Sequence, residues 1–126
     1  MNYKSILFFL GVYSLVVSFF SILNICYSIY LDFIIDINSY LITLTISLII
    51  GLSFFYIGYN ERKNITLTDQ IIFIISAFIL LPVLISIPYI NSIHNFNFLN
   101  SFFESVSGFT TTGFSIIDNI KNIDQP

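Results

Sequence analysis

Three stretches without a formal charge restrict what this chain can fold into. They run over residues 5–31, 37–60 and 70–103. An α-helix rises about 1.5 Å per residue, so about 20 apolar residues are needed to cross the ~30 Å hydrocarbon core of a membrane. Each stretch is long enough for one crossing. We therefore expect three transmembrane helices, over residues 6–28, 39–59 and 70–91.

The composition supports a fold in lipid. Only 9% of the residues are charged and 56% are hydrophobic, whereas a soluble domain carries roughly 25% charged residues. A water-soluble chain of this length buries only about two thirds of its surface, so lipid must cover much of what is left. The predicted fold class is an all-α membrane protein, with the lipid bilayer as a partner. No basic patch indicates nucleic-acid binding.

The first stretch has an alternative interpretation as a secretory signal, because it follows a single lysine near the N-terminus. Its apolar part exceeds the usual 7–15 residues, and no A-x-A cleavage site follows it. Cys26 lies within this stretch and is the only cysteine, so we expect it to be a small packing residue. A membrane crossing is the preferred interpretation.

The charged residues between the stretches predict the orientation. Arg62 and Lys63 follow the second stretch, whereas Asp32 and Asp36 separate the first from the second. Positive charges favour the cytoplasmic side of a membrane. We therefore expect the cell membrane as the location, with Lys4 and the N-terminus in the cytoplasm. The third crossing then brings residues 97–115 to the outer side.

The third crossing carries its own start and stop signals. Thr68 or Asp69 is the expected N-cap. Pro82 and Pro88 lie within the crossing, and each proline removes a backbone donor and clashes one turn back. We expect a kink or an early helix end near the outer side, with Pro88 the better candidate for the end. The alternative is that the membrane helix simply tolerates both prolines.

Residues 97–115 predict a helix too short to cross the membrane. Asn100 and Ser101 are candidate N-caps, and Glu104, three residues after Ser101, fits a capping box with it. The helix is expected to run to Ser107 and to end at Gly108, the residue type favoured just after a helix. Even from residue 97 it would cover only about 16 Å, half of the membrane. Such a helix lies on the surface or enters the membrane and returns.

The residues that follow favour entry into the membrane. Residues 109–114, Phe-Thr-Thr-Thr-Gly-Phe, show no helical period. Non-helical backbone exists at membrane depth only where it lines a water-filled cavity or is buried in protein. Carbonyl and hydroxyl oxygens in close succession can replace the hydration shell of a cation, and the negative end of the preceding helix dipole favours the same charge. The segment therefore predicts a cation-binding loop.

The motif at residues 102–113, Phe-Phe-Glu-Ser-x-Ser-Gly-x-Thr-Thr-Thr-Gly, closely resembles the first pore loop of the Trk/Ktr/HKT potassium transporter superfamily. Two helices ahead of the pore domain are similar to its Trk branch. The resemblance implies three transmembrane helices, a re-entrant pore helix and a selectivity-filter loop, the first part of a four-fold helix–pore loop–helix architecture. Residues 1–63 would form a two-helix hairpin. Residues 64–126 would form the first half of the pore domain, truncated before its second helix.

The resemblance also assigns roles to residues of the loop. It places potassium against Thr111 and Thr112, with Gly113 as the signature glycine of the filter. Thr110 and the carbonyl of Phe114 would flank the ion path. In the resemblance Glu104 supports the pore helix without touching the ion, and its simpler interpretation is a cap or a partner for nearby backbone donors.

The function that the resemblance implies is potassium uptake, with this chain in the ion-conducting subunit and potassium as substrate, without a cofactor. Family members carry four loops in one chain, so we expect an N-terminal fragment that needs the remaining pore repeats. A homodimer and a cytoplasmic nucleotide-binding regulatory subunit are further implied partners.

Two other classes of function stay open from the residues alone. One is a membrane anchor or assembly module in which residues 97–115 form an interfacial helix. The lack of Lys and Arg there weakens it, because interfacial helices usually have basic polar faces. The other is a membrane enzyme. The three crossings hold no ionisable groups except Cys26 and tyrosines, and no catalytic motif is present, so no enzyme is expected.

Overall fold

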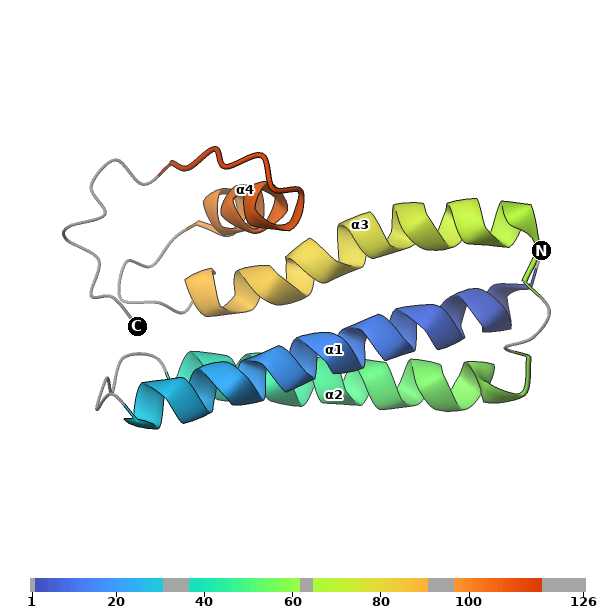
Figure 1. Ribbon diagram of the computed structural model, residues 1–126, viewed down its shortest axis with the longest axis horizontal. Coiled ribbons are helices and arrows are strands. Elements are labelled where there is room, and N and C mark those ends of the chain that lie inside the picture. Colours follow the sequence, from blue (N-terminus) through green and yellow to red (C-terminus); the bar gives the residue numbers. More distant parts are fainter. Residues whose placement is uncertain (1, 31–36, 62–64, 91–96, 117–126) are drawn as a thin grey trace.

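The computed structural model describes residues 2–30, 37–61, 65–90 and 97–116. Within these ranges the chain is helical and contains no strand. The elements are α1 (Tyr3–Tyr30), α2 (Ile37–Gly58), the short 3-10 helix η1 (Tyr59–Glu61), α3 (Leu67–Ile90) and α4 (Phe98–Phe109). Figure 1 shows α1, α2 and α3 lying side by side along the long axis, with α4 across the later half of α3. The predicted all-α class is confirmed.

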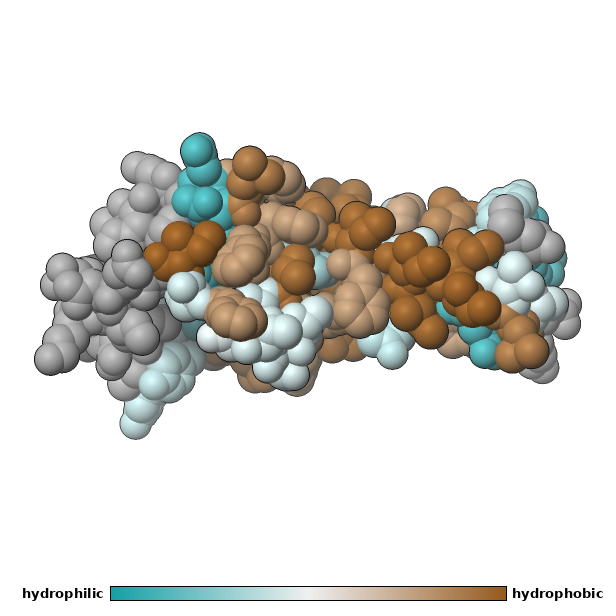
Figure 2. All heavy atoms as spheres, turned by 90° about the horizontal axis from the view of Figure 1, so that it is seen from above, coloured by the Kyte–Doolittle hydropathy of each residue, from teal (hydrophilic) through white to brown (hydrophobic). Residues whose placement is uncertain are grey.

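Three of the helices have the length and apolarity needed to cross a membrane. They are Tyr3–Tyr30, Ile37–Glu61 and Leu67–Ile90, so three long apolar helices are confirmed at the predicted positions, with ends that differ by one to three residues. Large hydrophobic side chains point outward on all of them, as lipid-facing surfaces require. In Figure 2, hydrophobic residues cover most of the described surface in view. Cys26 is exposed on this surface, so its prediction as a packing residue is wrong.

Helices α1 and α2 form a tightly packed antiparallel hairpin. A Cβ added to Gly11 of α1 would lie 2.5 Å from the backbone nitrogen of Phe55 in α2, so the two backbones touch at this point. Near the middle of both helices, the hydroxyls of Ser18 and Ser47 are hydrogen-bonded at 2.7 Å. Membrane helices without a hydrophobic driving force between them associate through such close approaches of small residues. The buried small polar residues of the two helices are Ser5, Ser14, Ser18, Ser21, Ser28, Ser39, Thr43 and Ser47.

A capping box begins α3 and ties it to the N-terminus. The Thr66 hydroxyl accepts the Asp69 N–H at 3.3 Å, and the Asp69 carboxylate accepts the Thr66 N–H at 3.1 Å. Thr66 is therefore the N-cap, and the prediction of Thr68 or Asp69 is wrong because Asp69 occupies the third helical position of the box. The other Asp69 oxygen accepts the Asn2 N–H at 2.9 Å, while the Asn2 amide reaches Glu61 at 3.5 Å. The starts of α1 and α3 and the end of α2 thus meet at one end of the bundle.

Helix α3 continues through both of its prolines. Pro82 and Pro88 lie inside the helix, which extends to Ile90. The prediction that Pro88 ends it is therefore wrong, and the alternative that the helix tolerates both prolines is confirmed. A proline in a long helix bends the axis when neighbouring structure supports it, and the ribbon of α3 changes direction along its length in Figure 1. The charges behind the predicted orientation, Asp32, Asp36, Arg62 and Lys63, lie outside the described residues.

Candidate ion-binding site

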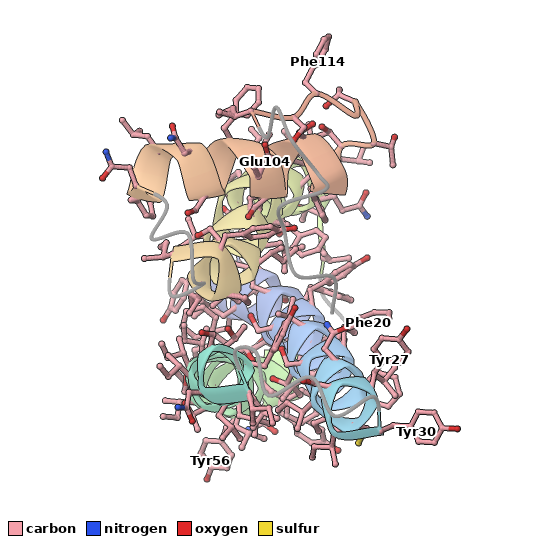
Figure 3. All side chains as sticks on the ribbon, turned by 90° about the vertical axis from the view of Figure 1, so that its left-hand side faces the viewer. Phe20, Tyr27, Tyr30, Tyr56, Glu104 and Phe114 are labelled. Atoms are coloured by element: carbon pink, nitrogen blue, oxygen red, sulfur yellow. The ribbon has the colours of Figure 1, made fainter. Side chains whose placement is uncertain are left out.

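Helix α4 packs on α3 and on no other helix among the described elements. The ring of Phe109, its last residue, meets the ring of Phe78 edge-on with centroids 5.4 Å apart. Phe78 is halfway along α3, which runs from Leu67 to Ile90. The C-terminal end of α4 therefore lies level with the middle of a helix that is long enough to span a membrane. Figures 1 and 3 show α4 crossing α3 steeply.

The N-terminal end of α4 differs from the prediction. The helix begins after Asn97, whose side chain makes no capping hydrogen bond, and it is 12 residues long. Ser101 lies in the second turn, fully buried, and its hydroxyl has no partner among the described residues. Glu104 binds residues further along the chain. The predicted capping box of Ser101 and Glu104 is therefore wrong, since the carboxylate finds its donors elsewhere.

The C-terminal end also differs. Gly108 remains helical, and the residues in the left-handed region are Thr111, with φ 56°, and Gly113, with φ 72°. Thr110 closes the helix, because its N–H and its hydroxyl both donate to the Val106 carbonyl, at 2.8 and 2.7 Å. The prediction that Gly108 follows the helix is thus wrong. A β-branched residue such as Thr111 rarely adopts a positive φ, so the backbone is strained at this position.

Ser107 connects the end of α4 to the loop. Its carbonyl accepts the Thr112 N–H at 3.1 Å, and the Thr112 hydroxyl lies 3.3 Å from both the carbonyl and the hydroxyl oxygen of Ser107. The Ser107 hydroxyl donates to the Phe114 carbonyl at 2.6 Å. Ser107 itself is only 5% exposed. One buried serine therefore holds two residues of the loop against the helix.

Glu104 holds the next part of the chain. One of its carboxylate oxygens accepts the Ser115 hydroxyl at 3.0 Å and the Ile116 N–H at 2.5 Å. The chain from Thr112 onward therefore runs back along α4. In Figure 3, the loop lies on the side of α4 away from α3, and the Phe114 side chain points outward.

The residues between the end of α4 and Phe114 carry a row of backbone oxygens that are consecutive in the sequence. The carbonyls of Thr110, Thr111, Thr112 and Gly113 accept no hydrogen bond from any described residue. Residues 111–116 are exposed and Thr110 is half-buried, and the hydroxyls of Thr110 and Thr112 lie 3.2 Å apart. Oxygen atoms of this kind are ligands for hard monovalent or divalent cations. In the described ranges, no three His, Cys, Asp or Glu side chains gather where they could hold a metal ion.

The predicted site residues are thus brought together in one short loop. The row consists of the carbonyls of Thr110, Thr111, Thr112 and Gly113, to which no described residue donates. The Phe114 carbonyl instead accepts the Ser107 hydroxyl. Sequence reasoning did not single out Ser107. The recurrence of serine at 101 and 105 marks one helix face, but a contact between residues 107 and 114 depends on the reversal of the loop and has no local signal.

No protein-family model and no solved structure matches this chain. The chain is similar to the Trk system potassium uptake protein TrkG of Escherichia coli strain K12. The two are 33% identical over 87 residues, which make up 68% of this chain and 18% of TrkG. The matched segment therefore spans less than a fifth of the length of this relative.

Proposed function

Because this chain is related to the Trk potassium uptake proteins, we propose that it takes part in the passage of potassium across the cell membrane. In this proposal residues 110–113 form part of the ion path. The observation that carries the proposal is the row of four consecutive carbonyls, to which no described residue donates, at the end of a helix that reaches the midpoint of α3.

The depth of the loop supports an ion path. If α3 crosses the membrane, the contact between Phe109 and Phe78 places the start of the loop about 16 Å from the start of α3 along its axis. Free backbone carbonyls at that depth cost several kcal/mol each in lipid, so they require water, protein or an ion as partner. A re-entrant pore helix with a filter loop meets this requirement, because water or an ion contacts its carbonyls. A helix on the membrane surface would not place these carbonyls at that depth.

The local charge favours a cation. Glu104 is the one formal charge in residues 97–116, and the loop follows the negative end of the α4 dipole. The carboxylate accepts hydrogen bonds from Ser115 and Ile116, so it attracts a cation in the loop by its charge and not by direct contact. We propose that Glu104 supports the loop and that Thr111, Thr112 and Gly113 provide ion contacts.

One loop can contact an ion from one side only. Filters surround an ion with several loops, so we propose that further loops, from a longer polypeptide or from other chains, complete the coordination. We therefore expect the purified chain in liposomes to show no potassium-selective flux. Selective flux would mean that copies of this same chain provide the missing loops. A homodimer and a nucleotide-binding regulatory subunit are further proposals that follow from the family resemblance.

Complementation tests the function. We would build a chimaera in which this chain replaces the part of TrkG that aligns with it, and express it in cells lacking other potassium uptake systems. Growth at low external potassium and rubidium uptake are the expected results. The matched control carries Gly113→Ser in the same chimaera. A chimaera that reaches the membrane but takes up no potassium would contradict the proposal and favour the anchor with an interfacial helix.

Cysteine labelling tests the proposed orientation. With Cys26 changed to Ser, because it is exposed, a cysteine at Asn64 is expected to resist an impermeant thiol reagent in intact cells. One at Ser92 is expected to react. The reverse pattern would place the N-terminus outside and the loop on the cytoplasmic side.

A further inference from the structure

We propose that Ser107 is a positioning residue that decides which carbonyls of the loop face an ion. In this view its hydroxyl withdraws the Phe114 carbonyl from the row, so that the ion-facing oxygens end at Gly113. The proposal rests on the function proposed above and extends it to a residue that does not contact the ion.

The contacts of Ser107 are concentrated at the point where the loop reverses. Its hydroxyl donates to the Phe114 carbonyl at 2.6 Å. Its carbonyl accepts the Thr112 N–H at 3.1 Å. The residue between these two, Gly113, has φ 72°. Ser107 therefore holds both sides of the left-handed residue.

This arrangement separates the carbonyls of the loop into two groups. The carbonyls of residues 110–113 have no donor among the described residues, whereas the next carbonyl, that of Phe114, is occupied. Beyond it, Glu104 binds the Ser115 hydroxyl and the Ile116 N–H. Without the Ser107 hydroxyl, the Phe114 carbonyl loses this donor, and its oxygen can turn toward the carbonyls of residues 110–113. The spacing of the ion-facing oxygens would then change.

Ser105 provides a matched control in the same helix. It is 2% exposed, and its hydroxyl donates at 2.8 Å to the carbonyl of Ser101, one turn back in α4. Ser105→Ala therefore removes an equally buried hydroxyl from the same helix without touching the loop. A purely structural contribution of buried serines would make the two alanine variants behave alike.

The first measurement follows the Phe114 carbonyl directly in the full chain. Labelling Phe at the carbonyl carbon and Ser at nitrogen marks two peptide bonds, Phe20–Ser21 in α1 and Phe114–Ser115 in the loop. In nanodiscs, Ser107→Ala is expected to shift the Phe114 carbonyl resonance and to leave that of Phe20 in place. Ser105→Ala is expected to move neither. An unchanged Phe114 resonance in Ser107→Ala would overturn the proposal, whatever the transport result.

The second measurement is competitive potassium and sodium uptake by the TrkG chimaera. The loss of one hydrogen bond predicts a two- to tenfold lower potassium preference in Ser107→Ala, at a membrane level equal to that of the unmodified chimaera. Ser105→Ala is expected to keep the wild-type preference, and Ser107→Thr, which keeps the hydroxyl, to restore most of it. A shifted Phe114 resonance with an unchanged preference would overturn the proposal, while the potassium function would stand. A chimaera without uptake would instead contradict the function itself.

Discussion

The α1–α2 hairpin and the α4 segment with its loop contain the same residue types, but these residues have different roles in the two regions. Both are rich in serine, threonine and glycine. In the hairpin, glycine lets two backbones touch, as at Gly11. In the loop, nothing lies within 4 Å of a Cβ added at Gly113, and the glycine is required by its φ of 72°. The first glycine is needed for space and the second for backbone conformation.

Hydroxyl groups show the same contrast. In the hairpin, Ser14 and Ser18 donate to carbonyls one turn back in their own helix, so these hydroxyls bind backbone inside a regular helix. In α4, the hydroxyls of Ser107 and Thr110 bind backbone at and beyond the helix end. Side chains there replace the hydrogen bonds that a regular helix would supply. The role of a polar residue in a membrane protein therefore depends on which backbone groups it contacts.

The largest expected effect separates the two kinds of glycine. Gly11→Ala places a Cβ 2.5 Å from the Phe55 nitrogen and 2.9 Å from the Gly51 carbonyl oxygen. Backbone atoms cannot move aside cheaply, so the hairpin is expected to lose about 1–3 kcal/mol. The measurement is the free energy of unfolding in micelles, followed by circular dichroism during titration with a denaturing detergent.

Gly108→Ala is the control for this prediction. Gly108 lies in α4 with nothing within 4 Å of an added Cβ, so alanine is expected to stabilise the helix by about 0.5–1 kcal/mol. The same substitution thus has opposite signs at the two positions. Two stabilising substitutions would show that α1 and α2 are not in backbone contact.

The next effect concerns the glycine of the loop. Gly113→Ser adds a Cβ at a positive φ, at a cost of about 1–2 kcal/mol in local geometry. A similar loss in the difference between potassium and sodium lowers selectivity by about five- to thirtyfold, measured by competitive uptake in the chimaera. Thr112→Val keeps the backbone carbonyl and is expected to have a smaller effect. Unchanged selectivity in Gly113→Ser would remove residues 110–113 from the ion path.

The smallest effect tests the polar contact between α1 and α2. Ser18→Ala removes the 2.7 Å hydrogen bond to Ser47, and hydrogen bonds between membrane helices contribute about 0.6 kcal/mol on average. Ser14→Ala is the matched control, because the equally buried Ser14 donates only to Leu10 of its own helix. The same unfolding titration compares them. Equal losses in the two variants would mean that the Ser18–Ser47 contact adds nothing to the hairpin.

The long helices were predictable because they depend on the hydropathy of many consecutive residues and not on any single contact. About 20 apolar residues in succession require a helix in lipid whatever their neighbours are, and the structure confirms all three. The ends of the helices were less predictable. The sequence predicts Asp69 and Glu104 near helix starts, yet only Asp69 completes a capping box, with Thr66. Glu104 lies in the middle of α4 and binds Ser115 and Ile116. Which donors a carboxylate finds depends on the path of the chain beyond the helix.

The sequence by itself determined the membrane class, the three long apolar helices of the described residues and the short helix with a threonine-rich segment after it. Hydropathy and the residue types that can adopt unusual backbone angles are local properties, so they can be read along the chain. Only the tertiary structure decided that α4 reaches the middle of α3, that Thr111 takes a left-handed conformation and that Ser107 holds the Phe114 carbonyl. The two contacts join residues that are apart in the sequence, and the Thr111 conformation belongs to the turn that brings Phe114 back to α4. All three depend on the path of the chain in space.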